Sequence, residues 1–360
     1  MMRPFALIGA LLVAVLATGL ALAADSDPLV SPRQLTNGNG NHLRPAWSPD
    51  GRQIAYQANQ GGGGHTIWVV NRDGSGQRRV TDGSGDDRRP AWSPDGAFLA
   101  YDSERNGERD IFVIPSGGGS PRRLTNAPGD DTFPSWSPDG RQIAYYSYAD
   151  GVMDVRVVDV AGGAVRTLTD GLATLDQKNC TFACHAVSWN GDGSQIAYTS
   201  GNQRNVVVTN ADGSGPRSLP GTQRVGTYHF PDWTADGGLI FISDERGEKP
   251  WTDIWRMDQN GQLTRLFTRV DHGGPFAWSP DGKSVAFHSP RSGQFQIYVA
   301  DLAGDGIGTL ATYRSGFASS TLTRTVQPVA VSAAVGTVAV AAVVGGVAGL
   351  WWLRRRARRR

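Results

Sequence analysis

The sequence lacks the signatures of several large enzyme classes. It contains no Gly-x-Ser-x-Gly segment, no Walker phosphate loop and no His-Glu-x-x-His segment, which argues against the hydrolases that carry these motifs. Cysteine is nearly absent, with two residues in 360. Charged residues are only 19% of the chain, while 47 glycines and 20 prolines are typical of short strands joined by tight turns. The missing motifs favour a non-enzymatic protein.

A basic surface is also missing from the middle of the chain. The formal net charge is +2 at pH 7. Removing Arg3 and the six arginines near the C-terminus leaves 28 basic residues against 33 acidic ones, a net charge of −5. Nucleic-acid-binding domains present a basic face. The sequence therefore predicts that nucleic acid is not a partner.

Both ends of the chain have the composition of membrane-directed segments. Residues 1–24 run from a basic start through an apolar stretch to small residues, which is typical of a secretory signal peptide. Residues 328–353 are uncharged and long enough for a transmembrane helix, and residues 354–360 form an arginine-rich tail. The positive-inside rule places this tail in the cytoplasm.

These ends predict a single-pass membrane protein with a cleaved signal peptide and an extracytoplasmic body, periplasmic or extracellular. A Ser/Thr-rich linker at residues 313–327 would join the body to the membrane helix. Alternatively, the C-terminal segment is a sorting tag that is removed after export.

The segment Trp-Ser-Pro-Asp-Gly recurs through the middle of the chain. The full and altered copies begin at Trp47, Trp92, Trp136, Trp189, Trp233 and Trp278. These tryptophans are 45, 44, 53, 44 and 45 residues apart. A fixed period of this length indicates one supersecondary unit used repeatedly.

Each period has the pattern of four short strands. In the first period they are expected at residues 44–48, 52–57, 66–71 and 78–81, with Ser-Pro-Asp-Gly as the turn between the first two. Six such units predict an all-β fold, a six-bladed β-propeller of four-stranded antiparallel blades over residues 31–312, followed by the C-terminal transmembrane helix.

Closure of the ring is predicted from a fourth-strand pattern that has no blade of its own. Residues 33–36 have this pattern and precede the first tryptophan. We expect them to pair with the third strand of the last blade, at residues 296–300. Residues 308–312 are a competing candidate for the same place.

The repeat resembles a known family. The Pro-x-Trp-Ser-Pro-Asp-Gly motif, the Ile-Ala-Tyr strand at residues 54–56 and the Asp-Ile-Trp strand at residues 253–255 are similar to the WD-repeat-like propeller repeats of TolB. The resemblance implies an exported propeller that binds other envelope proteins. The same repeat occurs in peptidase propellers and oligogalacturonate lyases. Relative to TolB, we expect no N-terminal α/β domain and an added C-terminal membrane anchor.

The strand order separates the two faces of the predicted ring. Turns after the first and third strands are nearly uniform, whereas loops after the second and fourth strands open on the other face and vary. Function concentrates in variable loops on a rigid scaffold. The residues expected on this binding face are His42, Asp87, Arg88, Asp131, His185, Tyr228, His229, His272 and His288.

Four of these histidines are expected to surround the central channel. They precede the blade tryptophans by four to six residues, and they are His42, His185, His229 and His272. Convergent imidazoles can hold a divalent metal ion, and the resemblance adds that the related lyases hold a metal largely through histidines. The alternative, which the sequence favours, is a set of unconnected polar loop residues with no cofactor.

The two cysteines, Cys180 and Cys184, lie in the loop that lengthens one spacing to 53 residues. Two nearby cysteines in an exported protein favour a disulfide. The alternative is haem attachment, because His185 follows directly, although the cysteines are one residue further apart than in the usual motif.

Two functional hypotheses follow. The first is a membrane-anchored module, without catalytic residues, that binds an envelope protein or a glycan through the variable face. The second is a metal-dependent polysaccharide lyase or hydrolase at the same channel mouth. The sequence favours the first.

Overall fold

Each repeat of the sequence forms one antiparallel sheet. The structure is a computed structural model, and it describes residues 29–59, 63–105, 107–172, 186–200, 205–219, 228–243, 251–271 and 276–302. These residues all belong to one compact unit, Met1–Phe317. The predicted signal peptide, linker, membrane helix and tail lie outside them. No helix among the described residues has the length and apolarity needed to cross a bilayer.

The described strands form six four-stranded sheets. The first blade consists of β2 (Asn41–Trp47), β3 (Gln53–Asn59), β4 (Thr66–Asn71) and β5 (Arg78–Arg79). The second consists of β6 (Asp86–Trp92), β7 (Phe98–Glu104), β8 (Arg109–Pro115) and β9 (Arg122–Arg123). The third consists of β10 (Asp130–Trp136), β11 (Gln142–Ala149), β12 (Val152–Asp159) and β13 (Val165–Thr167).

The other three blades repeat this order. The fourth consists of β14 (Val187–Trp189), β15 (Gln195–Thr199), β16 (Val206–Asn210) and β17 (Arg217–Ser218). The fifth consists of β18 (Tyr228–Trp233), β19 (Leu239–Ser243), β20 (Trp251–Met257) and β21 (Leu263–Asp271). The sixth consists of β22 (Ala277–Trp278), β23 (Ser284–Ser289), β24 (Gln296–Leu302) and β1 (Leu29–Gln34).

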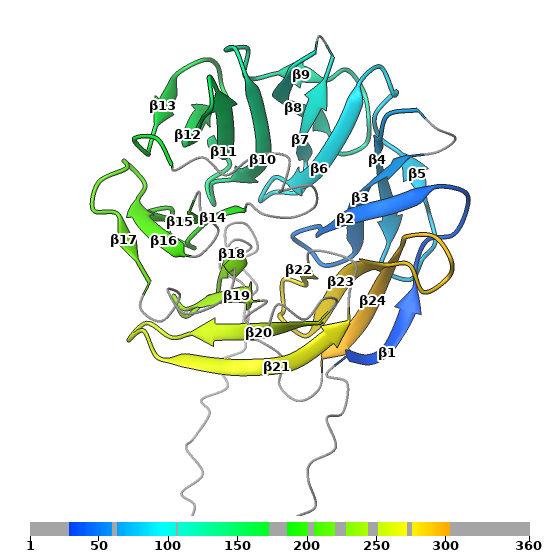
Figure 1. The fold of residues 1–360 in the computed structure, drawn as a ribbon. Helices are drawn as coiled ribbons and strands as arrows, with labels where there is room; N and C mark the ends of the chain where they lie inside the picture. The colour runs from blue at the N-terminus through cyan, green and yellow to red at the C-terminus, as the bar shows by residue number, and fades with distance from the viewer. Residues whose placement is uncertain are drawn as a thin grey trace, which may run out of the picture. The chain divides into compact units, whose positions relative to one another are not determined.

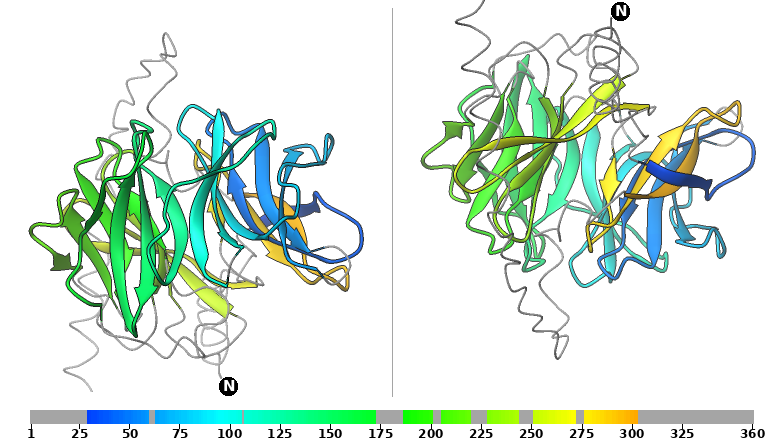
Figure 2. Two further views of the ribbon diagram at one scale, coloured as in Figure 1. Left: turned by 90° about the horizontal axis from the view of Figure 1, so that it is seen from above. Right: turned by 90° about the horizontal axis from the view of Figure 1, so that it is seen from below.

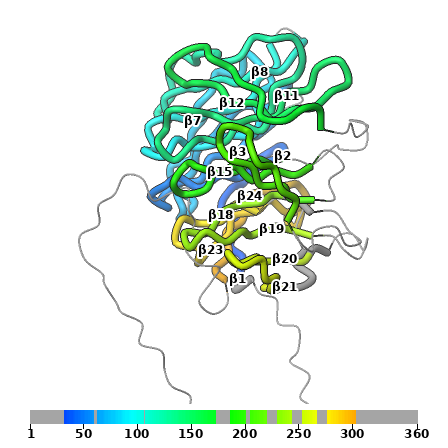
Figure 3. The backbone as a smooth tube through the Cα atoms, turned by 90° about the vertical axis from the view of Figure 1, so that its left-hand side faces the viewer, coloured from blue at the N-terminus to red at the C-terminus, as the bar shows by residue number. Residues whose placement is uncertain are grey.

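The sheets stand around a central axis, with the first strand of each blade innermost (Figure 1). Views from above and below show the sheets face to face with their neighbours (Figure 2). In Figure 3 the backbone colour changes from sheet to sheet, so consecutive blades are neighbours in space. This arrangement confirms the predicted six-bladed propeller of four-stranded antiparallel blades.

The ring closes through the N-terminal strand. β1 pairs antiparallel with β24, placing Gln34 opposite Tyr298 and Leu29 opposite Leu302. Figure 1 shows the blue β1 beside the orange β24. The predicted pairing of residues 33–36 with the last blade is therefore confirmed, and the paired strand begins at Leu29, slightly earlier than expected. The competing candidate, residues 308–312, lies outside the described residues.

The core lies in the seams between blades. Each of six buried clusters draws its residues from two neighbouring blades. One of them packs Val69 of the first blade against Trp92 and Tyr101 of the second. Because each sheet buries its faces against its neighbours, one blade alone cannot exclude water from its apolar residues.

The Ser-Pro-Asp-Gly turn is stabilised by its own side chains. In the first copy, the Asp50 carboxylate accepts hydrogen bonds from the Ser48 hydroxyl (2.6 Å) and the Arg52 amide (3.0 Å). Gly51 closes the turn from a left-handed conformation (φ 69°) that favours glycine. The motif thus fixes the turn at the end of the innermost strand, on one face of the ring. The start of the same strand lies at the opposite face.

Candidate functional site

The innermost strands of four blades contain a β-bulge three residues before the blade tryptophan. The register shifts between Leu43 and Ala46 in β2, and equivalently in β6, β10 and β18. The residue in each bulge has a positive φ. These residues are Arg44 (56°), Arg89 (54°), Phe133 (58°) and Phe230 (55°). Such values are uncommon for residues other than glycine, and proline follows each of them.

The bulge directs these four residues into the mouth of the central channel. They line a cavity of about 150 Å³ together with Pro45, Pro90, Pro134, Ala186 and Val187. A second cavity of about 250 Å³ shares many of these residues and continues along the inner strands. The cavity lies at the start of the innermost strands, so it opens towards the face that carries the variable loops.

Two guanidinium groups and one aromatic ring meet at this mouth. The Cζ atom of Arg89 lies 4.2 Å from the centroid of the Phe133 ring, and that of Arg44 lies 5.3 Å from the same centroid. A cation over an aromatic face within about 6 Å is attracted by the ring quadrupole. Burial, followed by the nearby charge of Arg89, lowers the pKa of Arg44 to about 9, although Asp102 acts in the opposite direction.

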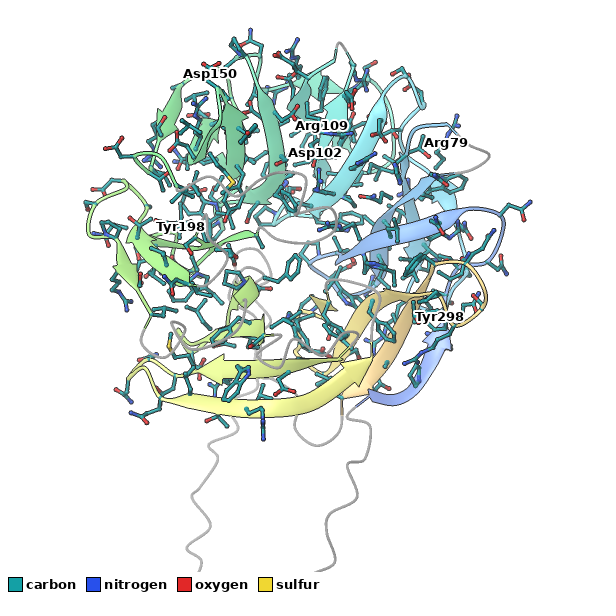
Figure 4. All side chains as sticks on the ribbon, viewed as in Figure 1. Arg79, Asp102, Arg109, Asp150, Tyr198 and Tyr298 are labelled. Carbon is teal, nitrogen blue, oxygen red and sulfur yellow. The ribbon has the colours of Figure 1, made fainter. Side chains whose placement is uncertain are left out.

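An ion-pair network holds Arg89 in place. Its Nη1 donates to the carboxylate of Asp102 (2.8 Å), which is fully buried and also accepts from Arg109 (3.2 Å). Arg109 in turn contacts Asp86 and Glu104. Arg109 and Asp102, labelled in Figure 4, lie together in the second blade. The backbone amide of Arg89 donates to the side-chain oxygen of Gln57, at 3.0 Å. Both parts of Arg89 are therefore fixed before any ligand binds.

The deeper channel wall carries one carboxylate among small residues. The residues one position before each blade tryptophan line the deeper cavity, and they are Ala46, Ala91, Ser135, Ser188, Asp232 and Ala277. Ser188 donates a hydrogen bond to Asp232, at 3.0 Å. Burial raises the pKa of Asp232 to about 6, while the bonds from Ser188 and the Trp233 amide act in the opposite direction.

Three of the residues expected on the binding face lie buried within the blades. His42, Asp87 and Asp131 occupy the same position, five residues before a blade tryptophan, with exposures of 0%, 0% and 1%. The inner ladder extends past this position, so they lie in strands and not in loops. The Asp87 carboxylate accepts a hydrogen bond from the Ser103 hydroxyl, at 2.6 Å. The centroid of the His42 ring lies 5.2 Å from the centroid of the Tyr56 ring.

The structure describes the side chains of two other predicted face residues. Arg88 forms an ion pair with Asp86 (2.7 Å), and His288 is buried in β23. Tyr228 and His229 belong to β18, but their side chains are not described. His185, His272, Cys180 and Cys184 lie outside the described residues, so the disulfide remains a prediction. Among the described residues, no group of three or more His, Cys, Asp or Glu is placed to hold a metal ion.

Sequence reasoning missed the four bulge residues. A continuous alternating strand points every second residue to one face, and a bulge changes that alternation. As a result Arg89 faces the channel, whereas its neighbour Arg88 pairs with Asp86. The usable signal is the residue before the Pro-x-Trp segment, which is Arg in two blades and Phe in two others of the four that carry this segment.

Comparison with known proteins agrees with this architecture. A family model described as the TolB beta propeller domain matches residues 30–186. Over 117 residues, 31% of this chain, the sequence is 32% identical to the TolB homologue of Chlorobium luteolum, and this match spans 25% of that relative's length.

Solved structures share the fold. A putative TolB from Agrobacterium tumefaciens matches with a TM-score of 0.54 and 23% identity, over 76% of this chain and 94% of that chain. TolB from Acinetobacter baumannii has a TM-score of 0.54 and 18% identity over 75% and 65% of the two chains. An oligogalacturonate lyase in complex with manganese has a TM-score of 0.55 and 13% identity, over 75% and 93%.

The fold and its axial site define a six-bladed β-propeller protein. The propeller resembles that of TolB: its first half matches the family model, part of the chain matches the Chlorobium relative, and the ring shares its fold with the TolB structures.

Proposed function

We propose that this protein is a membrane-anchored, extracytoplasmic β-propeller that binds another protein of the cell envelope at its channel mouth. The observation that carries this proposal is the set of bulge residues, which lie at one equivalent position in four blades, differ in chemistry and line one cavity. Strained backbone retained at a cavity is a feature of binding sites. The TolB-like fold and the predicted signal peptide and membrane helix support the location.

The proposal does not require catalysis. Apart from the arginines, the described mouth is lined by proline, phenylalanine, alanine and valine, which offer no nucleophile or general base. Packing of apolar side chains around a few fixed charged groups is typical of recognition. We therefore propose a binding role for this site.

The test is site-specific photo-crosslinking in the native cell envelope. A benzophenone amino acid at Phe230 reports on the channel mouth, and the same residue at Val165, exposed on the outer strand β13, is the control. We expect a discrete protein adduct from position 230 and none from position 165. Equal adducts at both positions, or none at either, would contradict the proposal.

A metal-dependent lyase is the second candidate, favoured by the fold shared with oligogalacturonate lyase. It requires a metal bound by histidines such as His42, His185, His229 and His272. Elemental analysis of the purified full-length protein, combined with a cleavage assay on polygalacturonate, decides between the two. Stoichiometric metal together with cleavage would replace the binding role with the enzymatic one.

A further inference from the structure

We propose that Arg44 and Arg89 form a carboxylate-binding pair, and that the segment bound at the channel mouth is an acidic peptide. This inference rests on the proposed function and names the chemistry of its ligand. The carboxylate is carried by an aspartate or glutamate side chain or by a free C-terminus.

The first support is the convergence of two cations from different blades. Arg44 belongs to β2 and Arg89 to β6, and both guanidinium groups lie over Phe133 of β10. All three side chains line the same cavity. Guanidinium groups bind carboxylates through paired N–H donors, and stacking on a ring restricts their orientation. A carboxylate in this cavity is therefore attracted by both guanidinium groups.

The second support is that Arg89 is already oriented. Asp102 holds one end of its guanidinium, and Arg109 fixes Asp102 in turn. The Arg89 side chain keeps 20% of its surface exposed, so part of it stays open to the cavity that it lines. Because Asp102 already holds the guanidinium group, an incoming carboxylate meets a donor that loses little conformational entropy on binding.

The third support concerns the rest of the lining. Pro45, Pro90 and Pro134 have no backbone N–H, and Phe133 and Phe230 are apolar. Such a wall suits the methylene groups and backbone of a peptide. A sugar, by contrast, needs many hydrogen-bonding partners for its hydroxyl groups, and the described part of the lining provides few. The apolar surface around two cations therefore favours an acidic peptide over an acidic glycan.

The fourth support is the change of charge along the channel. The two arginines line the mouth, whereas Asp232 lines only the deeper cavity. A carboxylate is attracted at the mouth and repelled further in when Asp232 is ionised. The sign change thus holds the acidic group at the mouth and leaves the deeper cavity of about 250 Å³ for a neutral or positively charged group.

The test measures binding of synthetic peptides to the purified full-length protein by fluorescence anisotropy. The main probe is a labelled hexapeptide of alternating Glu and Gly with both ends blocked. Its partner replaces each Glu with Gln, and a third peptide is this Gln peptide with a free C-terminus. Tetragalacturonate is the glycan probe.

We expect the Glu peptide or the free-terminus peptide to bind more tightly than the blocked Gln peptide, and we expect added salt to weaken that binding. R44Q and R89Q should each weaken binding about tenfold, since each removes a charge-assisted interaction. R79Q is the matched control, because Arg79 is exposed on β5, away from the channel (Figure 4), and should bind normally.

Thermal melting of each variant separates lost binding from lost folding. If R89Q is unfolded, R44Q and F133L carry the test. Equal affinity for all three peptides, or equal loss in R44Q and R79Q, overturns the carboxylate site. Tighter binding of tetragalacturonate than of either acidic peptide overturns the peptide assignment. Such failures leave crosslinking at position 230 intact, whereas failure of the proposed function removes those adducts.

Discussion

The indole nitrogen of Trp47 donates a hydrogen bond of 2.9 Å to the carbonyl oxygen of Ala277, which joins the first blade to the last. The same bond links successive blades elsewhere: Trp92 to Ala46, Trp136 to Ala91, Trp189 to Ser135 and Trp233 to Ser188, at 3.1 to 3.2 Å. Each acceptor is the residue directly before the preceding blade's tryptophan. The repeated tryptophan therefore bonds the inner wall of one blade to the next.

Replacing Trp47 with Phe is expected to destabilise the propeller by about 1–3 kcal/mol, because the Ala277 carbonyl is left without this donor. Urea denaturation measures the effect. W68F is the control, since the Trp68 indole bonds Thr66 in its own strand. An equal loss of unfolding free energy in W68F and W47F would show that the hydrogen bond between blades contributes no more than one within a strand.

Replacing Thr36 with Val tests the ring closure. The Thr36 hydroxyl donates to Gln296 (2.9 Å) and accepts from the Ile297 amide (2.9 Å), and all of this is buried. Loss of both bonds should cost about 1–3 kcal/mol and lower the melting temperature. T264V, at an exposed position of β21, should change stability by less than about 0.5 kcal/mol. An unchanged melting temperature in T36V would contradict the closing role of this segment.

His42 should make the protein sensitive to acid. Burial lowers its pKa to about 4, so the unfolded chain binds a proton more readily than the folded chain between about pH 6.5 and pH 4. The stability that the protein has with neutral, buried His42 is therefore fully present above pH 6.5 and is lost as the pH falls from there through 4. H42F should lose less stability than the parent protein over this range, as measured by denaturation midpoints. A constant difference between the two proteins at every pH would refute this.

Asp232 should have the opposite dependence. Burial raises its pKa to about 6, so the folded chain binds the proton more readily, and stability falls as the pH rises from about 4 to 6. D232N removes this penalty and should gain stability over the parent protein at pH 7.5 but not at pH 4. Asp131, whose pKa burial also raises to about 6, is present in both proteins and cancels in the comparison. A gain of equal size at both pH values would contradict the assignment.

The blade architecture was predictable because its determinants are local. The tryptophan period counts the blades, and Ser48, Asp50 and Gly51 form their turn through contacts within six residues. The pairing of β1 with the last blade was also predictable, because residues 33–36 have the fourth-strand pattern but precede the first blade. Short-range chemistry therefore determines the ring.

The channel mouth was harder to predict because it depends on packing between blades. His42 and Asp87 were expected in loops, but they lie buried in the inner strands β2 and β6. The orientation of Arg89 results from a bulge, and its position from Asp102 on the adjacent strand. No residue spacing in the sequence encodes either contact.

The pairing of β1 with β24 also has a consequence for the order of folding. Thr36 and Gln296 are 260 residues apart, so this contact cannot form before the last blade has been synthesised. The entropy of closing such a long loop grows only with the logarithm of its length, yet contacts of high sequence separation form slowly. Until then the chain is an open arc in which β24 has a free edge, and such edges pair readily with other chains. The N-terminal strand β1 is synthesised first and pairs last. Its pairing covers the edge of β24 and converts the open arc into a closed ring.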